Sequence, residues 1–293
     1  MNRISKLILL LHFLILTSCD VSKKETSDYV IIGTFNIAWL GDGSDDKINR
    51  TEEDYENIAD VIKNTKADVL GLEEIENEAA LQRLTKYLTD YEFYVSSQSG
   101  SQNPAILYKK GLEVEFICDY MPIAVVENRT KPGLVFQVKK RNFDWLIMIV
   151  HFKSTSRYDS TDELKEESRK IRTSQAEVLG YWIDSVLSIG SEQDIIIVGD
   201  FNDYPTRINN ATLTPLTDRN NMDFISSGME SCKYDYLSSI DHILISTSAG
   251  TRYLNNSVRI YDIYSSLPDE AAGKVSDHCP VLANFDIKLH DND

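Results

Sequence analysis

Basic residues are scarce in this sequence. Its 293 residues include 30 Lys and Arg against 46 Asp and Glu, which gives a formal net charge of −16 at pH 7. A protein that binds nucleic acid tightly through its surface carries the opposite charge, because each phosphate contact needs a cation. The composition argues against such a protein. It does not exclude an enzyme that holds phosphate through metal ions and a few local cations.

Cysteine is also scarce, and its four residues are Cys19, Cys118, Cys232 and Cys279. No two of them form a C-x-x-C pair, so neither a zinc cluster nor a disulfide framework is expected. Two of the three cysteines beyond Cys19 could still pair in an exported protein. The spacing does not say which two.

Repeats, low-complexity tracts and Pro- or Gly-rich linkers are missing from residues 29–290, and 42% of the chain is hydrophobic. This length and composition predict one globular domain over residues 29–290. Hydrophobic periodicity predicts strands and helices that alternate irregularly. The expected strands are 29–37, 68–72, 104–109, 112–118, 133–139, 143–152, 194–198, 240–246 and 281–287, and the expected helices are 52–64, 78–88 and 163–187. Adjacent strands mixed with returning helices predict an α/β fold of two packed sheets flanked by helices.

Residues 1–18 have the features of an export signal. Arg3 and Lys6 precede an apolar stretch, which at about ten residues is too short to span a bilayer. The Leu-Thr-Ser-Cys quartet that ends at Cys19 resembles the lipobox of bacterial lipoproteins, which implies cleavage before Cys19 and acylation of its thiol. We expect an exported lipoprotein, anchored to a membrane at the periplasmic face or cell surface, with residues 19–28 as a polar tether. An ordinary signal peptide that contains a cysteine is the alternative.

Polar side chains recur where the expected strands begin or end. They are Asn36, Glu73 and Glu74, His151, Asp200 and Asn202, Asp241, and Asp277 and His278. Each alone is more often a turn or loop residue than a functional one. Together, at six strand ends in one chain, they predict a shared site.

These residues lie in motifs that resemble the endonuclease/exonuclease/phosphatase superfamily, which has the deoxyribonuclease I-like fold. The motifs are Phe35-Asn36, Leu72-Glu73-Glu74, His151, Gly199-Asp200-Phe201-Asn202, Asp241 and Ser276-Asp277-His278. The resemblance spans nearly all of residues 29–288 and implies a four-layer α/β/β/α sandwich with the active site at one edge of the paired sheets. It also implies hydrolysis of phosphoester bonds, in substrates that range from DNA and RNA to inositol phospholipids and sphingomyelin.

The resemblance also implies a metal and a water-activating group. Glu74, Asn36 and Asp277 match the metal-site positions, and Mg²⁺ or Mn²⁺ is the expected cofactor, with Ca²⁺ as an alternative. Asp200 matches the carboxylate that orients or deprotonates the attacking water, and Asn202 matches an amide that donates to a phosphate oxygen. Many relatives have Gln where Glu73 stands. Because side chains alternate along a strand, only one of Glu73 and Glu74 is expected to face the metal, and Glu74 is the choice.

Two histidines and two cations complete the expected site. His278 matches the histidine at the scissile phosphate, acting as a base or as a protonated contact, and Asp241 would accept its other ring N–H. His151 matches a second histidine that contacts phosphate or assists the leaving group. Arg129 resembles a phosphate-contacting arginine, with a plain surface cation as the alternative, and Lys153 is a further candidate for a phosphate contact.

The expected function is that of a metal-dependent phosphodiesterase, a nuclease acting on DNA or RNA. An inositol-phosphate phosphatase or a sphingomyelinase-like phospholipid hydrolase is the alternative, since it would use the same active site. A surface binding module that kept only the fold is a third class, and the full set of catalytic residue types argues against it. The expected partners are the phosphoester substrate and, through Cys19, a membrane. No protein partner is inferred, and a monomer is expected.

Overall fold

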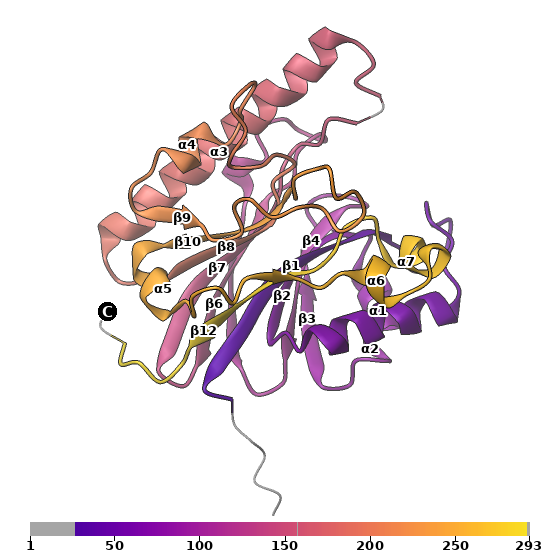
Figure 1. The fold of residues 1–293 in the computed structure, drawn as a ribbon, viewed down its shortest axis with the longest axis horizontal. Coiled ribbons are helices and arrows are strands. Elements are labelled where there is room, and N and C mark those ends of the chain that lie inside the picture. Colours follow the sequence, from indigo (N-terminus) through magenta and orange to yellow (C-terminus); the bar gives the residue numbers. More distant parts are fainter. Residues whose placement is uncertain (1–26, 157, 292–293) are drawn as a thin grey trace, which may run out of the picture.

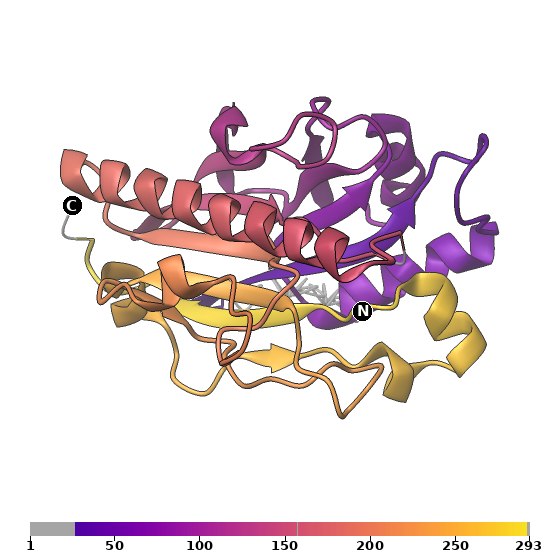
Figure 2. The same cartoon turned by 90° about the horizontal axis from the view of Figure 1, so that it is seen from above.

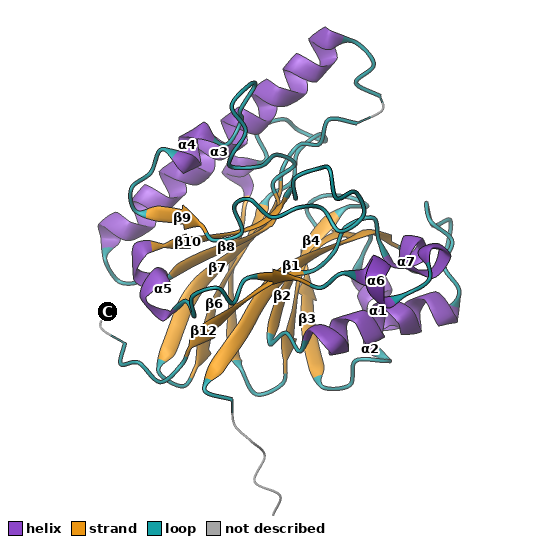
Figure 3. Cartoon of the chain, in the orientation of Figure 1, coloured by secondary structure: helices purple, strands orange, loops and turns teal. Residues whose placement is uncertain are grey.

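The structure is a computed structural model and describes residues 27–156 and 158–291. The expected export signal, the Cys19 lipidation site and most of the tether therefore lie outside the described residues. Two six-stranded sheets pack face to face, with helices on both outer sides (Figures 1 and 3). The predicted α/β fold, a four-layer α/β/β/α sandwich, is confirmed.

The first sheet contains the N- and C-terminal strands of the domain. Its strand order is β11 (Arg259–Ile260), β12 (Val281–Asp286), β1 (Tyr29–Leu40), β2 (Val69–Ile75), β4 (Asn103–Lys109) and β3 (Tyr91–Val95). Strand β1 pairs with β2 in parallel and with β12 antiparallel. Its outer side is covered by α1 (Glu52–Thr65), α2 (Glu78–Thr85), α6 (Ile263–Ser266) and α7 (Asp269–Val275).

The second sheet is built from the middle of the chain. Its strand order is β5 (Glu113–Tyr120), β6 (Gly133–Lys140), β7 (Phe143–His151), β8 (Ile195–Asp200), β10 (Asp241–Ser246) and β9 (Met222–Phe224). The long helix α3 (Asp162–Ile189) covers its outer side (Figure 2). Two further short helices are α4 (Thr214–Thr217) and α5 (Thr247–Arg252), and a 3-10 turn, η1, spans Met121–Ile123.

Local sequence explains the main helices. Thr51 and Asp54 form a capping box at the start of α1, and apolar residues at helical spacing, such as Tyr55, Ile58 and Ile62, are buried against the first sheet. Helix α3 begins after Thr161 and ends at Gly190, whose left-handed backbone terminates it. Among the described residues, no helix combines the length and the apolar character needed to cross a membrane.

The core between the sheets is aliphatic and aromatic. Val30, Ile32 and Val69 of the first sheet pack with Ile149 and Val198 of the second. The sheets are thereby held in a fixed relation, which brings the ends of their strands to one common edge. Strands β1 and β2 run in parallel, as do β7 and β8, so the carboxyl ends within each pair lie side by side.

The register then aligns the polar residues at that edge. His151 lies opposite Asp200 in the parallel pair of β7 and β8, and Asp241 lies opposite Asp200 in the antiparallel pair of β8 and β10. Gly199 is required here because its φ is +151° and an added Cβ would lie 1.9 Å from the carbonyl oxygen of Val150. Glycine therefore lets β8 deliver Asp200 to the edge of the sheet.

Candidate active site

A cleft of about 390 Å³ opens at this edge of the two sheets. Six of the residues expected from the sequence line it, and they are Glu74, His151, Asp200, Asn202, Asp277 and His278. They come from both sheets and from the loop before β12, so they are far apart in the chain. Packing of the two sheets brings their side chains into one site.

His278 and Asp241 form the closest charged pair of the site. Nδ1 of His278 lies 2.7 Å from Oδ2 of Asp241, and Nε2 lies 3.9 Å from Oδ1 of Asp277. Burial by itself lowers the pKa of His278, but the carboxylates of Asp241, Asp200 and Asp277 outweigh it and hold the pKa well above its usual value. The ring is therefore cationic near neutral pH, and Asp241 fixes its orientation.

Asp200 lies at the centre of the cleft. Its Oδ1 accepts a hydrogen bond from the Asn202 backbone N–H at 2.8 Å, and its Oδ2 accepts one from Nδ2 of Asn36 at 3.1 Å. Burial, followed by the nearby charge of Asp241, raises the pKa of Asp200 to about 6, although His278 and His151 act in the opposite direction. A carboxyl group with this pKa suits proton transfer near neutral pH.

His151 is the uncharged histidine of the site. Its Nε2 lies 3.7 Å from Oδ2 of Asp200 and 3.9 Å from Oε1 of Glu74. Burial lowers the pKa of His151 despite the nearby Asp200 carboxylate. Its Nδ1 is a buried atom for which the described residues provide no hydrogen-bond partner. The neutral ring can donate a hydrogen bond or accept a proton at the centre of the cleft.

The two asparagines of the site differ in the hydrogen bonds that their side chains make. Asn202 has a left-handed backbone, with φ of 53°, and its Nδ2 donates to the carbonyl oxygen of Phe152 at 3.0 Å. One amide hydrogen of Asn202 thus stays available to a ligand. Asn36 is buried, donates to Asp200 and accepts from the Ala38 N–H at 2.9 Å, so it bridges β1 to β8 across the two sheets.

The neighbouring glutamates lie in different environments. Strand alternation directs Glu73 between the two sheets, where it is fully buried and accepts a hydrogen bond from Oγ1 of Thr34 at 2.7 Å. Burial raises its pKa well above the usual value. Glu74 has a φ of 62°, which breaks the alternation and turns its side chain into the cleft. The position chosen from sequence is therefore the one that faces the site.

Arg129 and Lys153 do not lie among the lining residues of the cleft. The guanidinium of Arg129 pairs with Glu167 of α3. The ammonium of Lys153 contacts the carbonyl oxygen of Ser154 and lies 3.8 Å from Asp159. Both cations are thus engaged beside the site rather than in it.

Two other lysines, which sequence reasoning missed, lie at the site. Lys131 donates to the Ser99 carbonyl oxygen at 3.2 Å, and its charge acts on both Glu74 and His151. Lys233 lines the cleft itself. Lys131 belongs to the same Arg-Thr-Lys-Pro-Gly stretch as Arg129, in which the family resemblance pointed to the arginine.

Trp39 was also missed, although it follows the Phe-Asn motif by three residues. It lines the cleft, has a φ of 60°, and carries the ammonium of Lys47 3.6 Å from its ring centroid. An aromatic residue with a left-handed backbone is strained, and such strain is concentrated at functional sites. The motif contained no pattern that pointed to the conformation of this residue.

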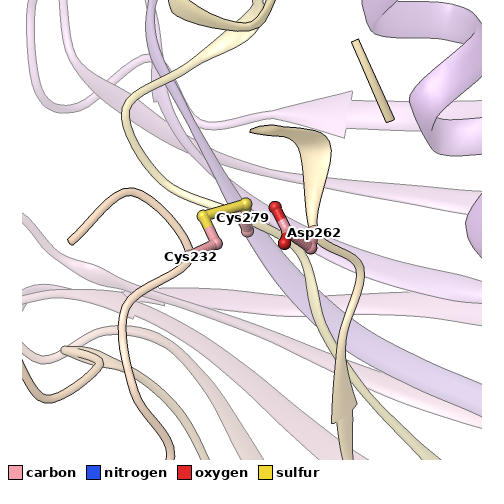
Figure 4. Close-up of side chains that lie close together, drawn as sticks. All are labelled: Cys232, Asp262 and Cys279. Carbon is pink, nitrogen blue, oxygen red and sulfur yellow. A yellow bond between two sulfur atoms is a disulfide. The ribbon is translucent and has the colours of Figure 1, made fainter. Parts of the chain in front are cut away.

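Cys232 and Cys279 form a disulfide across a separation of 47 residues (Figure 4). The bond joins the loop before β10 to the residue that follows His278. Asp262 lies beside the two sulfurs, but its carboxylate accepts hydrogen bonds from the backbone N–H groups of Tyr264 and Ser265 as the cap of α6. The group is therefore a disulfide next to a helix cap, and Cys118 is the free cysteine of the described residues.

We predict that reduction of this disulfide destabilises the protein. A cross-link that closes a loop of 47 residues restricts the unfolded chain, and its removal should lower the free energy of unfolding by about 2–4 kcal/mol. Urea unfolding of the oxidised and reduced protein measures the difference. A Cys118→Ser background serves as control because it prevents thiol exchange, and identical unfolding midpoints would contradict the prediction.

The donor set of the cleft fits a divalent cation. Carboxylates of Glu74 and Asp277 line it together with Asp200, and carboxylate oxygens are the ligands that Mg²⁺ and Mn²⁺ prefer. Burial raises the pKa of both Glu74 and Asp200, and the neighbouring carboxylates of Asp277 and Asp241 act in the same direction. Within the site, ligand atoms of Asp200, Asp241 and His278 lie within 4.8 Å of one another, and Oδ1 of Asp241 is buried with no hydrogen-bond partner among the described residues.

The chain is similar to known proteins both in sequence and in fold. The profile of the Endonuclease/Exonuclease/phosphatase family matches residues 33–278. A search of curated proteins found no match. Among solved structures, D. rerio TDP2 complexed with single strand DNA product has a TM-score of 0.62 and 16% identity, covering 88% of this chain and 99% of that chain.

Two bacterial structures are similar to the same extent. An endonuclease/exonuclease/phosphatase family protein from Bacteroides thetaiotaomicron has a TM-score of 0.58 and 15% identity, covering 89% of this chain and 99% of its own. The mannosyl-6-phosphatase Bt3783 of the same organism has a TM-score of 0.56 and 14% identity, and the match covers 87% of this chain and 98% of that chain. At these identities the structural likeness establishes the fold and leaves the substrate open.

Proposed function

Because the chain belongs to the endonuclease/exonuclease/phosphatase family, whose members are metal-dependent hydrolases of phosphoester bonds, we propose that it is a phosphodiesterase that cleaves nucleic acids. The observation that carries this proposal is the convergence of Asp200, the Asp241–His278 pair, Asn202 and Glu74 on one cleft. Hydrolysis of a phosphodiester needs a base for water, donors for the phosphate oxygens and a counter-charge.

Asp200 is the proposed general base. In its ionised form it can accept a proton from a water held between it and the phosphorus, and its hydrogen bonds from Asn202 and Asn36 hold its two oxygens in place. The water oxygen then bonds to phosphorus as the ester oxygen departs. Asn202 is the proposed donor to a non-bridging phosphate oxygen, through its remaining amide hydrogen.

His278 is the proposed cationic contact of the scissile phosphate. Its raised pKa favours this role over that of a base, since a protonated ring cannot accept a further proton. Asp241 stabilises the charge and leaves Nε2 directed to the substrate. His151 is neutral, and we assign it to the leaving-group side, where its ring N–H can donate a hydrogen bond to the departing oxygen while that oxygen takes its proton from solvent.

A divalent cation supplies charge neutralisation and polarises the phosphate when it is bound. Glu74 and Asp277 are the proposed ligands, and the amide oxygen of Asn36 is a candidate third. Lys131 and Lys233 add positive charge around them. This local charge allows a strongly acidic protein to bind a phosphate.

The surroundings of His278 favour a diester over a monoester. A second cavity of about 200 Å³ shares Asp277 and His278 with the cleft. A phosphate at His278 can therefore extend a substituent on each side, as the two ester groups of a diester require. The TDP2 structure with a single-stranded DNA product supports the nucleic-acid class, whereas the mannosyl-6-phosphatase neighbour supports a monoester as the alternative.

One substrate panel tests the function. Residues 28–293 are purified and incubated with Mg²⁺, Mn²⁺ or Ca²⁺ and with plasmid DNA, single-stranded DNA, RNA, inositol phosphates, mannose 6-phosphate or sphingomyelin. Cleavage of nucleic acid that EDTA abolishes supports the proposal. Release of phosphate or phosphocholine with nucleic acids left intact would instead assign the monoesterase or phospholipid hydrolase.

We predict an acidic limb near pH 6 in the pH dependence of kcat/KM. Protonated Asp200 cannot accept a proton, and its pKa is about 6, so kcat/KM should fall about tenfold for each pH unit below that value. The raised pKa of His278 places the alkaline limb well above neutrality. Initial rates at saturating metal measure the profile, and a rate that stays constant through pH 6 would assign the base to another group.

We also propose that the protein is exported and anchored through Cys19. The disulfide supports this location, because such bonds persist in oxidising compartments and are rare in the cytosol. An enzyme held at the periplasmic face or cell surface would act on phosphoesters outside the cytoplasm. This part of the proposal rests on the N-terminal motif together with the disulfide.

A further inference from the structure

The segment 231–239, here called the 231–239 loop, forms one side of the site. Cys232 binds it covalently to Cys279, the residue after His278. The cavity of about 200 Å³ lies between this loop and His278, and Tyr234, Leu237 and Ser239 line it. The disulfide thus fixes the loop beside the scissile position, so that a ligand in the cavity would be adjacent to the reacting phosphate.

Aromatic rings are exposed on this loop. Tyr234 is 44% and Tyr236 77% exposed, and their ring centroids lie 5.8 Å apart. Adjacent exposed aromatic rings beside an active site offer a surface on which an unstacked base can stack. An apolar cavity of about 150 Å³ can hold a benzene ring, so the cavity beside Tyr234 is large enough for a single six-membered ring.

The same loop directs a cation toward the cleft. Lys233 lines the cleft, and its ammonium lies 5.4 Å from the ring centroid of Tyr234 and 5.9 Å from that of Tyr264. Asp277, at 57% side-chain exposure, lies on the border between cleft and cavity. One loop therefore places a phosphate-binding charge and a stacking ring next to each other, as the two parts of a nucleotide require.

We propose that the 231–239 loop is a nucleotide subsite, in which Tyr234 stacks on the base attached to the scissile phosphate and Lys233 binds that phosphate. The inference rests on the proposed phosphodiesterase function and specifies its substrate as an unpaired nucleotide in a single strand. A base in a duplex is stacked and cannot enter such a cavity without leaving the helix.

The lining of the cavity favours a nucleotide over a lipid chain. Ser231, Ser238 and Ser239 supply hydroxyl groups, and Asp241 and His278 supply charged ones. Hydroxyls and charges can bond to the edge of a base or to a sugar. An acyl chain would remove water from these polar and charged groups without offering them a hydrogen bond, at a cost in free energy. The exposed Tyr236 and Leu237 make a membrane surface the competing interpretation, which the experiment below separates.

The test compares two oligomers with the same backbone, oligothymidylate and an oligomer with tetrahydrofuran in place of every base. Wild-type protein should show a larger kcat/KM on oligothymidylate. In Tyr234→Ala the ratio of the two kcat/KM values should fall by about tenfold, while Tyr234→Phe should retain it because the ring remains. Tyr181→Ala is the matched control, since Tyr181 is 70% exposed on the outward side of α3.

Lys233→Gln provides a second readout. It should lower kcat/KM on both oligomers by a similar factor, because the lost contact is to the phosphate that they share. Circular dichroism and the unfolding midpoint establish that each variant is folded, which the exposure of Tyr234 leads us to expect.

Each outcome has a distinct meaning. An unchanged ratio in Tyr234→Ala, with wild-type protein active on oligothymidylate, overturns the subsite and leaves the phosphodiesterase function intact. Absence of nucleic-acid cleavage by wild-type protein overturns both. If Tyr234→Ala and Tyr236→Ala instead weaken binding to phosphatidylcholine–sphingomyelin vesicles, the loop faces a lipid surface and the nucleotide subsite is rejected.

Discussion

Replacement of His278 by alanine is expected to lower kcat for phosphodiester cleavage by about 10²- to 10⁴-fold. The ring is the proposed cationic contact of the scissile phosphate, and its Nδ1 is fixed by Asp241 at 2.7 Å. Alanine removes both the charge and the donor at Nε2. Steady-state rates on single-stranded DNA at saturating Mg²⁺ or Mn²⁺ measure the loss.

The matched control is His290→Ala, which removes an exposed histidine at the opposite end of the last strand. It should leave kcat unchanged, because His290 lies outside the cleft. The unfolding midpoint of His278→Ala should be measured in parallel, since the buried Asp241 loses its partner. A folded His278→Ala protein that retains more than about a tenth of wild-type kcat would contradict the role given to this residue.

The second large effect is expected at Glu74. Glu74→Gln should raise the metal concentration that gives half-maximal activity by about 100-fold or more. A neutral amide is a poorer ligand for a hard cation than a carboxylate. Part of the lost activity should return at high metal concentration. Metal titration of activity, together with calorimetric titration of Mn²⁺ without substrate, measures the effect by two independent readouts.

The neighbouring residue supplies the control for this experiment. Glu73→Gln should stay close to wild type in both readouts, because Glu73 is buried between the sheets with a strongly raised pKa and is replaced by a neutral group of similar shape. The hydrogen bond from Thr34 can still be accepted by the amide oxygen. Equal losses of metal binding in the two variants would show that the metal does not depend on Glu74 specifically.

Much of the fold could be predicted because its strands are apolar and its helices are amphipathic. The expected strand at 194–198 and the expected helix at 163–187 correspond to β8 and α3 within a few residues. Strand β3 was missed, as were the short β9 and β11. Strand β3 is an edge strand bonded only to β4, so its stability depends on a partner that local sequence does not specify.

The candidate site could be predicted in part for a different reason. Asp200, Asp241 and His278 lie in short motifs at strand ends. Each alone is more often a turn residue, but their recurrence at six strand ends of one chain indicates a shared site. Lys131 and Lys233 lie in loops without such a pattern. Arg129 was chosen because it resembles a phosphate-contacting arginine of the family. The path of the loop decides that the charge of Lys131, two residues away, acts on Glu74 and His151, while Arg129 pairs with Glu167.

The sequence alone determined the order of the main strands and helices, the fold class of two packed sheets, and the kinds of polar side chain at the strand ends. These follow from local periodicity and from short motifs, which act over a few residues. The tertiary structure decided the backbone turn that directs Glu74 into the cleft, which cysteines pair, and which lysines lie at the cleft. Those outcomes depend on strand register, on a left-handed backbone and on contacts between segments far apart in the chain, and local patterns do not encode them.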